Sequence, residues 1–215
     1  MTLKEFENIC YRLIDTNQYN ELKNHIELAR NTGIKIQGRL QFELFIWTIW
    51  SVEKRKASLK IFDTLVESGL DINVRDGIFG NTVLMSAIEI MNFDNIRYLI
   101  EKGARVNIFN STGETPFMIA CEQHNKDVLN LLIENGADIN TLDDDGFDCL
   151  SYAVCNRNNN AIKYLLKKNV NVFHKNCHEE SAIDIAKKFQ YEDIVKIFNR
   201  YIKKISKENK SGKKQ

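Results

Sequence analysis

Apolar residues along this chain recur at helical spacing in short segments that polar stretches separate. The first two segments, 3–14 and 19–30, flank the polar run 15–18 and predict two helices that Gly33 closes as a pair. Further along, Ile119, Val128 and the pair 131–132 recur at the spacing that places apolar side chains on one helix face. The pattern therefore predicts an all-α chain built from short antiparallel helix pairs.

Glycine positions give these pairs a fixed period. Two series keep an interval of 33 residues: Gly80, Gly113 and Gly146, and Gly103 and Gly136. Asn169 follows at the next interval, and asparagine is the usual substitute where a backbone needs positive φ. Such a period indicates stacked supersecondary units rather than a globule around one enclosed core. The open surface of a stack suits binding better than catalysis.

The unit at 110–142 shows the repeat most clearly. A glycine turn leads into Thr115-Pro116-Phe117-Met118-Ile119-Ala120, a second helix ends in Leu131-Leu132, and the unit closes with Gly136-Ala137-Asp138-Ile139-Asn140. This resembles the ankyrin repeat, with its T-P-L-H-x-A-like helix start and its G-A-D-x-N ending, and the flanking units match in register. The resemblance implies an ankyrin-repeat solenoid of stacked helix–turn–helix units with projecting hairpin loops.

Residues of this motif have definite physical roles. The Thr115 hydroxyl is expected to cap the first helix by accepting a backbone N–H of its first turn. Pro116, the only proline of the chain, falls at the first helical position, where its fixed φ helps and its missing N–H costs nothing. Gly136 is expected to end the second helix in a left-handed turn, and Leu132 to be buried between repeats.

The ends of the array depart from the motif. We expect an N-terminal capping helix pair at 1–36 and a repeat region at 37–202. Its parts are predicted as follows: repeats at 37–75 (degenerate), 76–109, 110–142 and 143–175, and a degenerate C-terminal capping unit from 176. The first repeat lacks the T-P motif and has a longer link at 52–57, and Glu179 replaces a glycine of the last unit. The lysine-rich residues 203–215 are expected to be a disordered tail, with phosphate binding as the alternative.

Composition favours a cytoplasmic protein, and we expect it to be monomeric when unbound. The net charge of +1 gives no global field toward nucleic acid or membrane, so nucleic acid is an unlikely partner. No signal peptide is expected, because the first residues lack a basic and then an apolar region. The longest apolar run, 44–50, is too short to span a bilayer. We interpret it as a buried helix that packs Phe45, Trp47 and Trp50 against its neighbours.

Five scattered cysteines indicate reduced thiols. His174, Cys177 and His178 form a local group of metal-ligand types, and Cys149 or Cys155 is the conceivable fourth ligand of a zinc site. No C-x-x-C pair supports this, so an ordinary loop is preferred and no metal or cofactor is expected. The acidic run 143–145 lacks the ligand spacing of a calcium loop and is interpreted as a solvated turn.

Catalytic motifs are absent from the sequence. It has no phosphate-binding glycine loop followed by Gly-Lys-Ser/Thr, no Gly-x-Ser-x-Gly and no His-Glu-x-x-His. We therefore expect a protein that is not an enzyme, with a cryptic active site as the less favoured alternative.

Partners of ankyrin-repeat proteins usually bind the concave face, which the hairpin tips and the exposed sides of the first helices form. The resemblance places such positions here at Ile78, Phe79, Asn81, Glu89, Ile90, Thr112, Glu114, Glu122, Gln123, Asp144, Asp145, Phe147 and Asn156. Acidic residues are common among them and basic residues are lacking. We expect a partner protein with a basic and apolar surface. The alternative is that the tips are merely polar, with Phe79 and Phe147 folded onto their own hairpins.

The sequence thus predicts a non-catalytic protein–protein interaction module that acts as an adaptor, a scaffold or a stoichiometric inhibitor. A narrower form is an immunity protein or a host-directed effector that neutralises one protein. Nucleic-acid binding through the lysine tail is the third class, and the near-zero net charge weighs against it.

Overall fold

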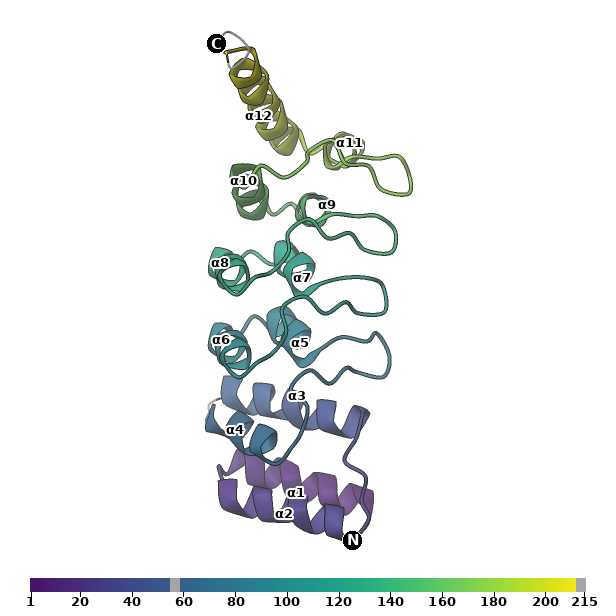
Figure 1. Cartoon of the computed structure of the whole chain (residues 1–215), viewed down its shortest axis with the longest axis vertical. Coiled ribbons are helices and arrows are strands. Elements are labelled where there is room, and N and C mark those ends of the chain that lie inside the picture. Colours follow the sequence, from purple (N-terminus) through teal and green to yellow (C-terminus); the bar gives the residue numbers. More distant parts are fainter. Residues whose placement is uncertain (55–58, 212–215) are drawn as a thin grey trace. The chain divides into compact units, whose positions relative to one another are not determined.

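A computed structural model describes residues 1–54 and 59–211, as a series of helices joined by turns and hairpin loops (Figure 1). Contacts divide the chain into two compact units, Met1–Thr112 and Gly113–Gln215. Regular structure in the described residues is helical, apart from three isolated bridges between single residue pairs. The prediction of an all-α repeat fold is confirmed.

The first unit is a stack of helix pairs. Its described helices are α1 Leu3–Asp15, α2 Tyr19–Asn31, α3 Arg39–Glu53, α4 Lys60–Glu67, α5 Val83–Ile90 and α6 Phe93–Glu101. Helix α1 packs against α2 and α3, while α3 also packs against α4 and α5, and α2 packs against α4. The first helices of the pairs therefore follow one another in one row, and their second helices pack on one side of it.

The second unit repeats this arrangement. Its described helices are α7 Pro116–Glu122, α8 Lys126–Glu134, α9 Cys149–Cys155, α10 Asn159–Lys167, α11 Ala182–Lys188 and α12 Glu192–Ser211. Helix α9 packs between α7 and α11, and α10 packs against α8, α9 and α12. A long hairpin loop precedes α9 and another precedes α11 (Figure 1).

Side-chain caps fix where the short helices begin. The Thr115 hydroxyl accepts a hydrogen bond from the backbone N–H of Met118 at 3.3 Å, and Pro116 is the first residue of α7, as predicted. Thr82 caps α5 in the same way, through the N–H of Met85 at 3.3 Å. A capped start matters here because helices of two turns gain little from propensity alone.

Left-handed turns explain the spacing of the glycines. Gly113 has φ +79°, and a Cβ atom there would lie 2.6 Å from the backbone nitrogen of Asp144, so only glycine fits. Asn169 takes the same region with φ +58°, which confirms its reading as a glycine substitute. Glu179 also adopts it, with φ +59°, at a cost of roughly 1–2 kcal/mol.

The core lies between the helix rows within each unit. Leu132 and Val128 of α8 are fully buried, as predicted, and Ile119 of α7 is nearly so. Ala120 and Ala153 are also fully buried, on α7 and α9, which pack directly on each other. Small side chains at these positions let the two helices approach closely.

Two expectations were wrong, and both concern helices at the margins of the array. In α3, Phe45 is buried as expected, but Trp47 is 40% exposed and Trp50 is 48% exposed. Each residue turns a helix by about 100°, so the buried residues Leu44, Phe45 and Ile49 occupy one arc, and the tryptophans fall on the opposite arc. A continuous apolar run on a helix cannot all face one core.

The predicted disordered tail is the second correction. Helix α12 continues to Ser211, through most of the range 203–215. Ile202 and Ile205 are half-buried and extend its apolar face, and Lys204 pairs with Glu208 at 3.7 Å, one turn on. Lysine is itself a good helix former. Residues 212–215 of the tail, and 55–57 of the predicted link 52–57, lie outside the described residues.

Candidate partner-binding surface

The hairpin tip before α5 is held by one carboxylate. Asp76 Oδ1 accepts hydrogen bonds from the three backbone N–H groups of residues 78–80, at 2.8, 2.6 and 2.9 Å. Gly80 closes the turn with φ +70°, and a Cβ atom there would lie 2.5 Å from Ser111 Oγ. The backbone N–H of Ser111 donates to the Phe79 carbonyl at 2.8 Å, which ties the tip to the next loop of the same unit.

This fixed tip presents two apolar side chains to solvent. Ile78 is 78% exposed and Phe79 is 64% exposed. The helix cap Thr82 follows Asp76 by six positions, whereas the cap Asp148 follows Asp143 by five, so the first tip is one residue longer. The alternative in which Phe79 folds onto its own hairpin does not hold.

The tip before α9, in the second unit, uses the same device. Asp143 Oδ1 accepts from the backbone N–H groups of Asp145 and Phe147, at 3.0 and 2.7 Å. Asp144 and Asp145 are exposed, while Phe147 is half-buried and meets the ring of His178 edge-on, with centroids 6.5 Å apart. The Phe147 side chain is therefore partly folded onto the protein, unlike that of Phe79.

A tyrosine joins two carboxylates beside this tip. The Tyr152 hydroxyl lies 2.7 Å from Asp143 Oδ2 and 2.9 Å from Glu114 Oε1. Burial, and then the two carboxylates as hydrogen-bond acceptors, raise the pKa of Tyr152. A phenol has one proton, so it can donate to only one carboxylate at a time.

Four further predicted residues lie in the first unit. Asn81 Oδ1 accepts from Asn110 Nδ2 at 2.9 Å, and the Thr112 hydroxyl donates to Asn110 Oδ1 at 2.8 Å. On α5, Glu89 is exposed and Ile90 is half-buried. Asn81 and Thr112 therefore help to hold the loops, while Glu89 and Ile90 are accessible to solvent on α5.

The remaining predicted residues lie in the second unit. Glu122 and Gln123, at the end of α7, are half-buried, and the Gln123 carbonyl accepts a hydrogen bond from Asn158 Nδ2. Asn156 is exposed and donates to the carbonyl of Tyr152 at 3.2 Å. The backbone carbonyl of Gln123 therefore helps to hold α7 to the following helix pair, while its side chain is half-buried.

Sequence reasoning missed the residues that hold the tips. Four Asx residues share this role at the start of the hairpins: Asp76, Asn110, Asp143 and Asn176. The sequence did contain a signal for them, an aspartate or asparagine five or six positions before each helix cap. These side chains commonly accept a hydrogen bond from the backbone N–H two residues later. Tyr152 was missed because nothing in the local sequence indicates its two acceptors.

The suggested zinc ligands are not brought together. His174 Nε2 lies 2.9 Å from the carbonyl oxygen of Gly146, which accounts for one of its ring nitrogens. All five cysteines are free thiols; Cys10, Cys121 and Cys149 are buried, and Cys155 and Cys177 are exposed. Among the residues that the structure describes, no group of three or more His, Cys, Asp or Glu side chains could hold a metal ion.

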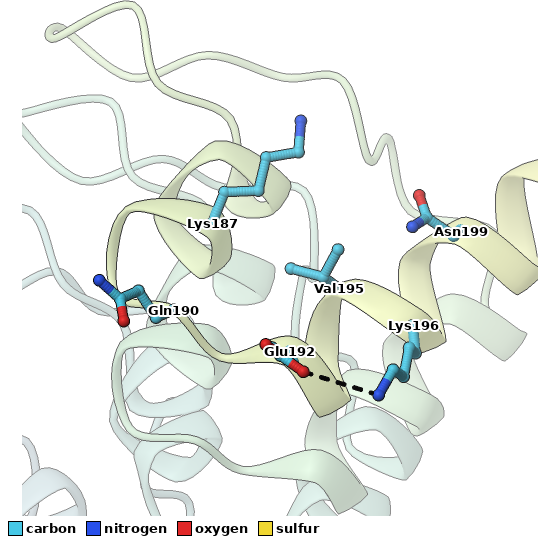
Figure 2. A pocket seen from close by; sticks show the side chains of 6 residues that line it. All are labelled: Lys187, Gln190, Glu192, Val195, Lys196 and Asn199. Atoms are coloured by element: carbon cyan, nitrogen blue, oxygen red, sulfur yellow. Dashed lines mark ion pairs between the residues drawn. The ribbon is translucent and has the colours of Figure 1, made fainter.

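A hollow of about 520 Å³ lies where α11 leads into α12 (Figure 2). Its lining consists of Lys187, Gln190, Glu192, Val195, Lys196 and Asn199. Glu192 pairs with Lys196 at 3.7 Å, one turn later on α12. We assign no function to this hollow.

Comparison with known protein families identifies the central part of the chain. Residues 49–143 match the family model of ankyrin repeats (3 copies), so this stretch consists of ankyrin repeats. Ankyrin repeats are generally protein–protein interaction modules and are typically non-catalytic. No curated protein matches the chain. The individual repeat boundaries, the capping pair at 1–36 and the capping unit from 176 stay predictions.

Within residues 1–54 and 59–211, no helix has the length and apolar content that crossing a membrane requires.

Proposed function

We propose that the chain is a non-catalytic binding module that holds one partner protein through its hairpin tips and the exposed sides of its first helices. As an adaptor, scaffold or stoichiometric inhibitor, it needs no chemistry beyond recognition. The observation that carries this proposal is the Ile78–Phe79 tip, where a braced backbone presents two apolar side chains to water. Apolar and aromatic anchors supply most of the energy in protein interfaces, and bracing reduces the entropy lost on binding.

The two units contribute different chemistry to this proposal. The first unit supplies the apolar tip at 78–79. The second supplies carboxylates near its tip, from Glu114, Asp143, Asp144 and Asp145, in the order of the chain. The first tip suits an apolar surface of a partner, and the carboxylates near the second tip suit basic groups. Rim carboxylates of this kind affect the association rate and its salt dependence more than they affect the final affinity.

Photo-crosslinking in the cell that makes the protein tests the proposal. A benzoylphenylalanine at position 79 should form a defined crosslink to one partner, while the same group at the exposed position of Leu28, on the second helix α2 of the same unit, should not. Excess wild-type protein should suppress the crosslink, and excess Ile78→Ser/Phe79→Ser protein should not. Identical crosslinks at both positions would contradict a partner site at the tip.

Binding of the purified partner then separates anchors from rim residues. Phe79→Ala should weaken affinity by about 1–4 kcal/mol. Phe147→Ala is expected to do the same, but its ring also contacts His178, so its stability must be measured alongside. Asp144→Asn should slow association at low salt and leave dissociation almost unchanged.

A further inference from the structure

A second surface of the first unit is also built for binding. A groove of about 440 Å³ lies between α1 and α3, and we call it the tryptophan groove. Its lining consists of Tyr11, Phe42, Glu43, Ile46, Trp47 and Trp50. Five of the six side chains are aromatic or aliphatic, and none belongs to the tip surface proposed above.

The apolar lining lies mainly outside the core of the first unit. The groove residues of α3 lie on the arc opposite its buried side chains, and both tryptophans are well exposed. Exposed apolar patches that are not required by packing mark interaction sites.

The rings of the groove are already held in place. Trp47 stacks on Tyr11 with centroids 4.6 Å apart, and its indole N–H donates to Asp15 Oδ1 at 3.1 Å. Asp15 Oδ1 also accepts a hydrogen bond from the Ser51 hydroxyl. A ligand would therefore meet rings that need little reordering.

Charge around the groove indicates what kind of side chain enters it. Glu43 lies in the lining, and Glu7 and Asp15 lie one turn before and one turn after Tyr11 on α1. Glu7 and Glu43 also line a neighbouring pocket together. Burial, and then the carboxylates of Glu43 and Glu7, raise the pKa of Tyr11 to about 12. The surroundings favour a positive charge.

The cations of the chain itself already use this chemistry. Lys54 Nζ lies 5.0 Å from the centre of the Trp50 ring, and Arg39 Nε lies 2.5 Å from Glu43 Oε1. One ammonium thus sits over an aromatic face, and one guanidinium pairs with the groove carboxylate. These contacts are at the exposed margin, where a side chain from another protein could replace them or lie beside them.

We propose that the tryptophan groove binds a basic, aliphatic segment of a partner protein. A lysine or arginine of that segment lies against the tryptophan rings near Glu43 and Glu7, and an aliphatic neighbour packs on Phe42 and Ile46. An amphipathic helix fits best, because the groove residues of α3 follow at helical spacing over about two turns. This surface is additional to the hairpin tips, and neither proposal depends on the other.

Intrinsic fluorescence tests the proposal directly, because Trp47 and Trp50 are the only tryptophans of the chain. The probe is an amphipathic helical peptide of leucine, arginine and alanine, about 14 residues long, which is enough for roughly four turns. Matched peptides replace its arginines by glutamine or its leucines by serine. The leucine–arginine peptide should give a saturable change in tryptophan emission, and both matched peptides should bind about tenfold more weakly or worse.

Variants then locate the binding. Glu43→Gln, and more strongly Glu7→Gln/Glu43→Gln, should weaken the leucine–arginine peptide several-fold and reduce the salt dependence of its binding. The matched control Glu21→Gln, on the exposed surface of α2, should not change it. Phe79→Ala should also bind the peptide normally, so failure at the tip and failure at the groove can be told apart. Circular dichroism of each variant confirms that it is folded.

Three results would overturn the proposal. One is equal binding of the glutamine peptide, which would mean an apolar surface without cation preference. Another is unchanged binding by the Glu7→Gln/Glu43→Gln variant. The third is a concentration-dependent emission shift with sedimentation as a dimer before any peptide is added, because the groove would then be covered by a second copy of the chain.

Discussion

The hydroxyl of Tyr152 lies 2.7 Å from Asp143 Oδ2, and through this contact a side chain of α9 holds the aspartate that shapes the preceding hairpin tip. The other oxygen of Asp143 accepts the N–H groups of residues 145 and 147. Both oxygens of one carboxylate therefore have structural partners. Asp143 therefore links the hairpin backbone to helix α9, and this link holds the tip in place.

Removing the Tyr152 hydroxyl should loosen this arrangement. Tyr152→Phe leaves Asp143 and Glu114 without their shared donor, and a lost hydrogen bond to a charged group costs about 1–3 kcal/mol. Urea unfolding followed by circular dichroism measures the loss. Tyr164→Phe deletes the same atom from a half-buried tyrosine on α10 and should change stability less. Equal losses in the two variants would show that the contact with Asp143 has no special weight.

The packing of the second unit should depend strongly on Leu132. This side chain is fully buried in α8, so Leu132→Ala should reduce the free energy of unfolding by about 2–5 kcal/mol through lost contacts and a residual cavity. Repeat stability is close to a sum of unit and interface terms, so adjacent helix pairs should weaken too. Leu142→Ala removes the same atoms from a residue that is 42% exposed and should cost far less. An unchanged melting temperature for Leu132→Ala would contradict the repeat register.

Most of the fold could be predicted because the ankyrin motif is local. Thr115 and Pro116 determine a helix start from adjacent positions, and the glycine period determines where the turns fall. Even Asn169 could be recognised from its place in the period. Signals of this kind need no knowledge of contacts far along the chain.

The candidate binding surfaces were harder to predict, because exposure depends on what neighbouring helices cover. The run 44–50 gives no sign that α1 and α5 leave one arc of α3 open, so Trp47 and Trp50 were wrongly placed in the core. The tail was wrongly predicted to be disordered for a related reason. Its many lysines make the composition look disordered, although Ile202 and Ile205 continue the apolar face of α12. Phe79 was assigned correctly to a tip, but its exposure depends on the bonds of Asp76.

Acid should weaken the first unit through Asp63. Burial raises the pKa of this carboxyl, but hydrogen bonds from Lys102 Nζ and the Tyr98 hydroxyl, each at 2.7 Å, outweigh it and leave the pKa lowered. A carboxyl whose pKa is lower in the folded state adds stability above its unfolded pKa, near 4, and that stability is lost as the pH falls through the folded value.

The comparison of wild type with Asp63→Asn tests this linkage. The variant should melt at a lower temperature than wild type at neutral pH, and the difference should shrink as the pH falls below about 4. Asp94→Asn serves as the matched control, because the Asp94 carboxylate is largely exposed and pairs with Arg97 at 3.6 Å. A difference between wild type and Asp63→Asn that stays constant from neutral to acid pH would rule out the carboxylate as its source.

Thiol labelling should separate the five cysteines into two classes. Cys155 and Cys177 are exposed and should react with iodoacetamide in the folded protein, whereas Cys10, Cys121 and Cys149 should react only as the protein opens. Burial raises the pKa of Cys10 to about 12 and that of Cys121 well above its usual value, so the reactive thiolate is scarce as well as covered.

The pH dependence gives a sharper form of this prediction. Cys155 is exposed as a residue, but neighbouring atoms partly desolvate its thiol. This desolvation, and then the Glu122 carboxylate, raise the pKa of Cys155, so its labelling rate should still increase with pH above the usual thiol value of about 8.5. Mass spectrometry of digested samples assigns each rate to its cysteine. Urea should make all five sites react at similar rates. Fast labelling of Cys121 in the folded protein would mean that the α7–α9 packing opens readily, and it would contradict the buried core described for the second unit.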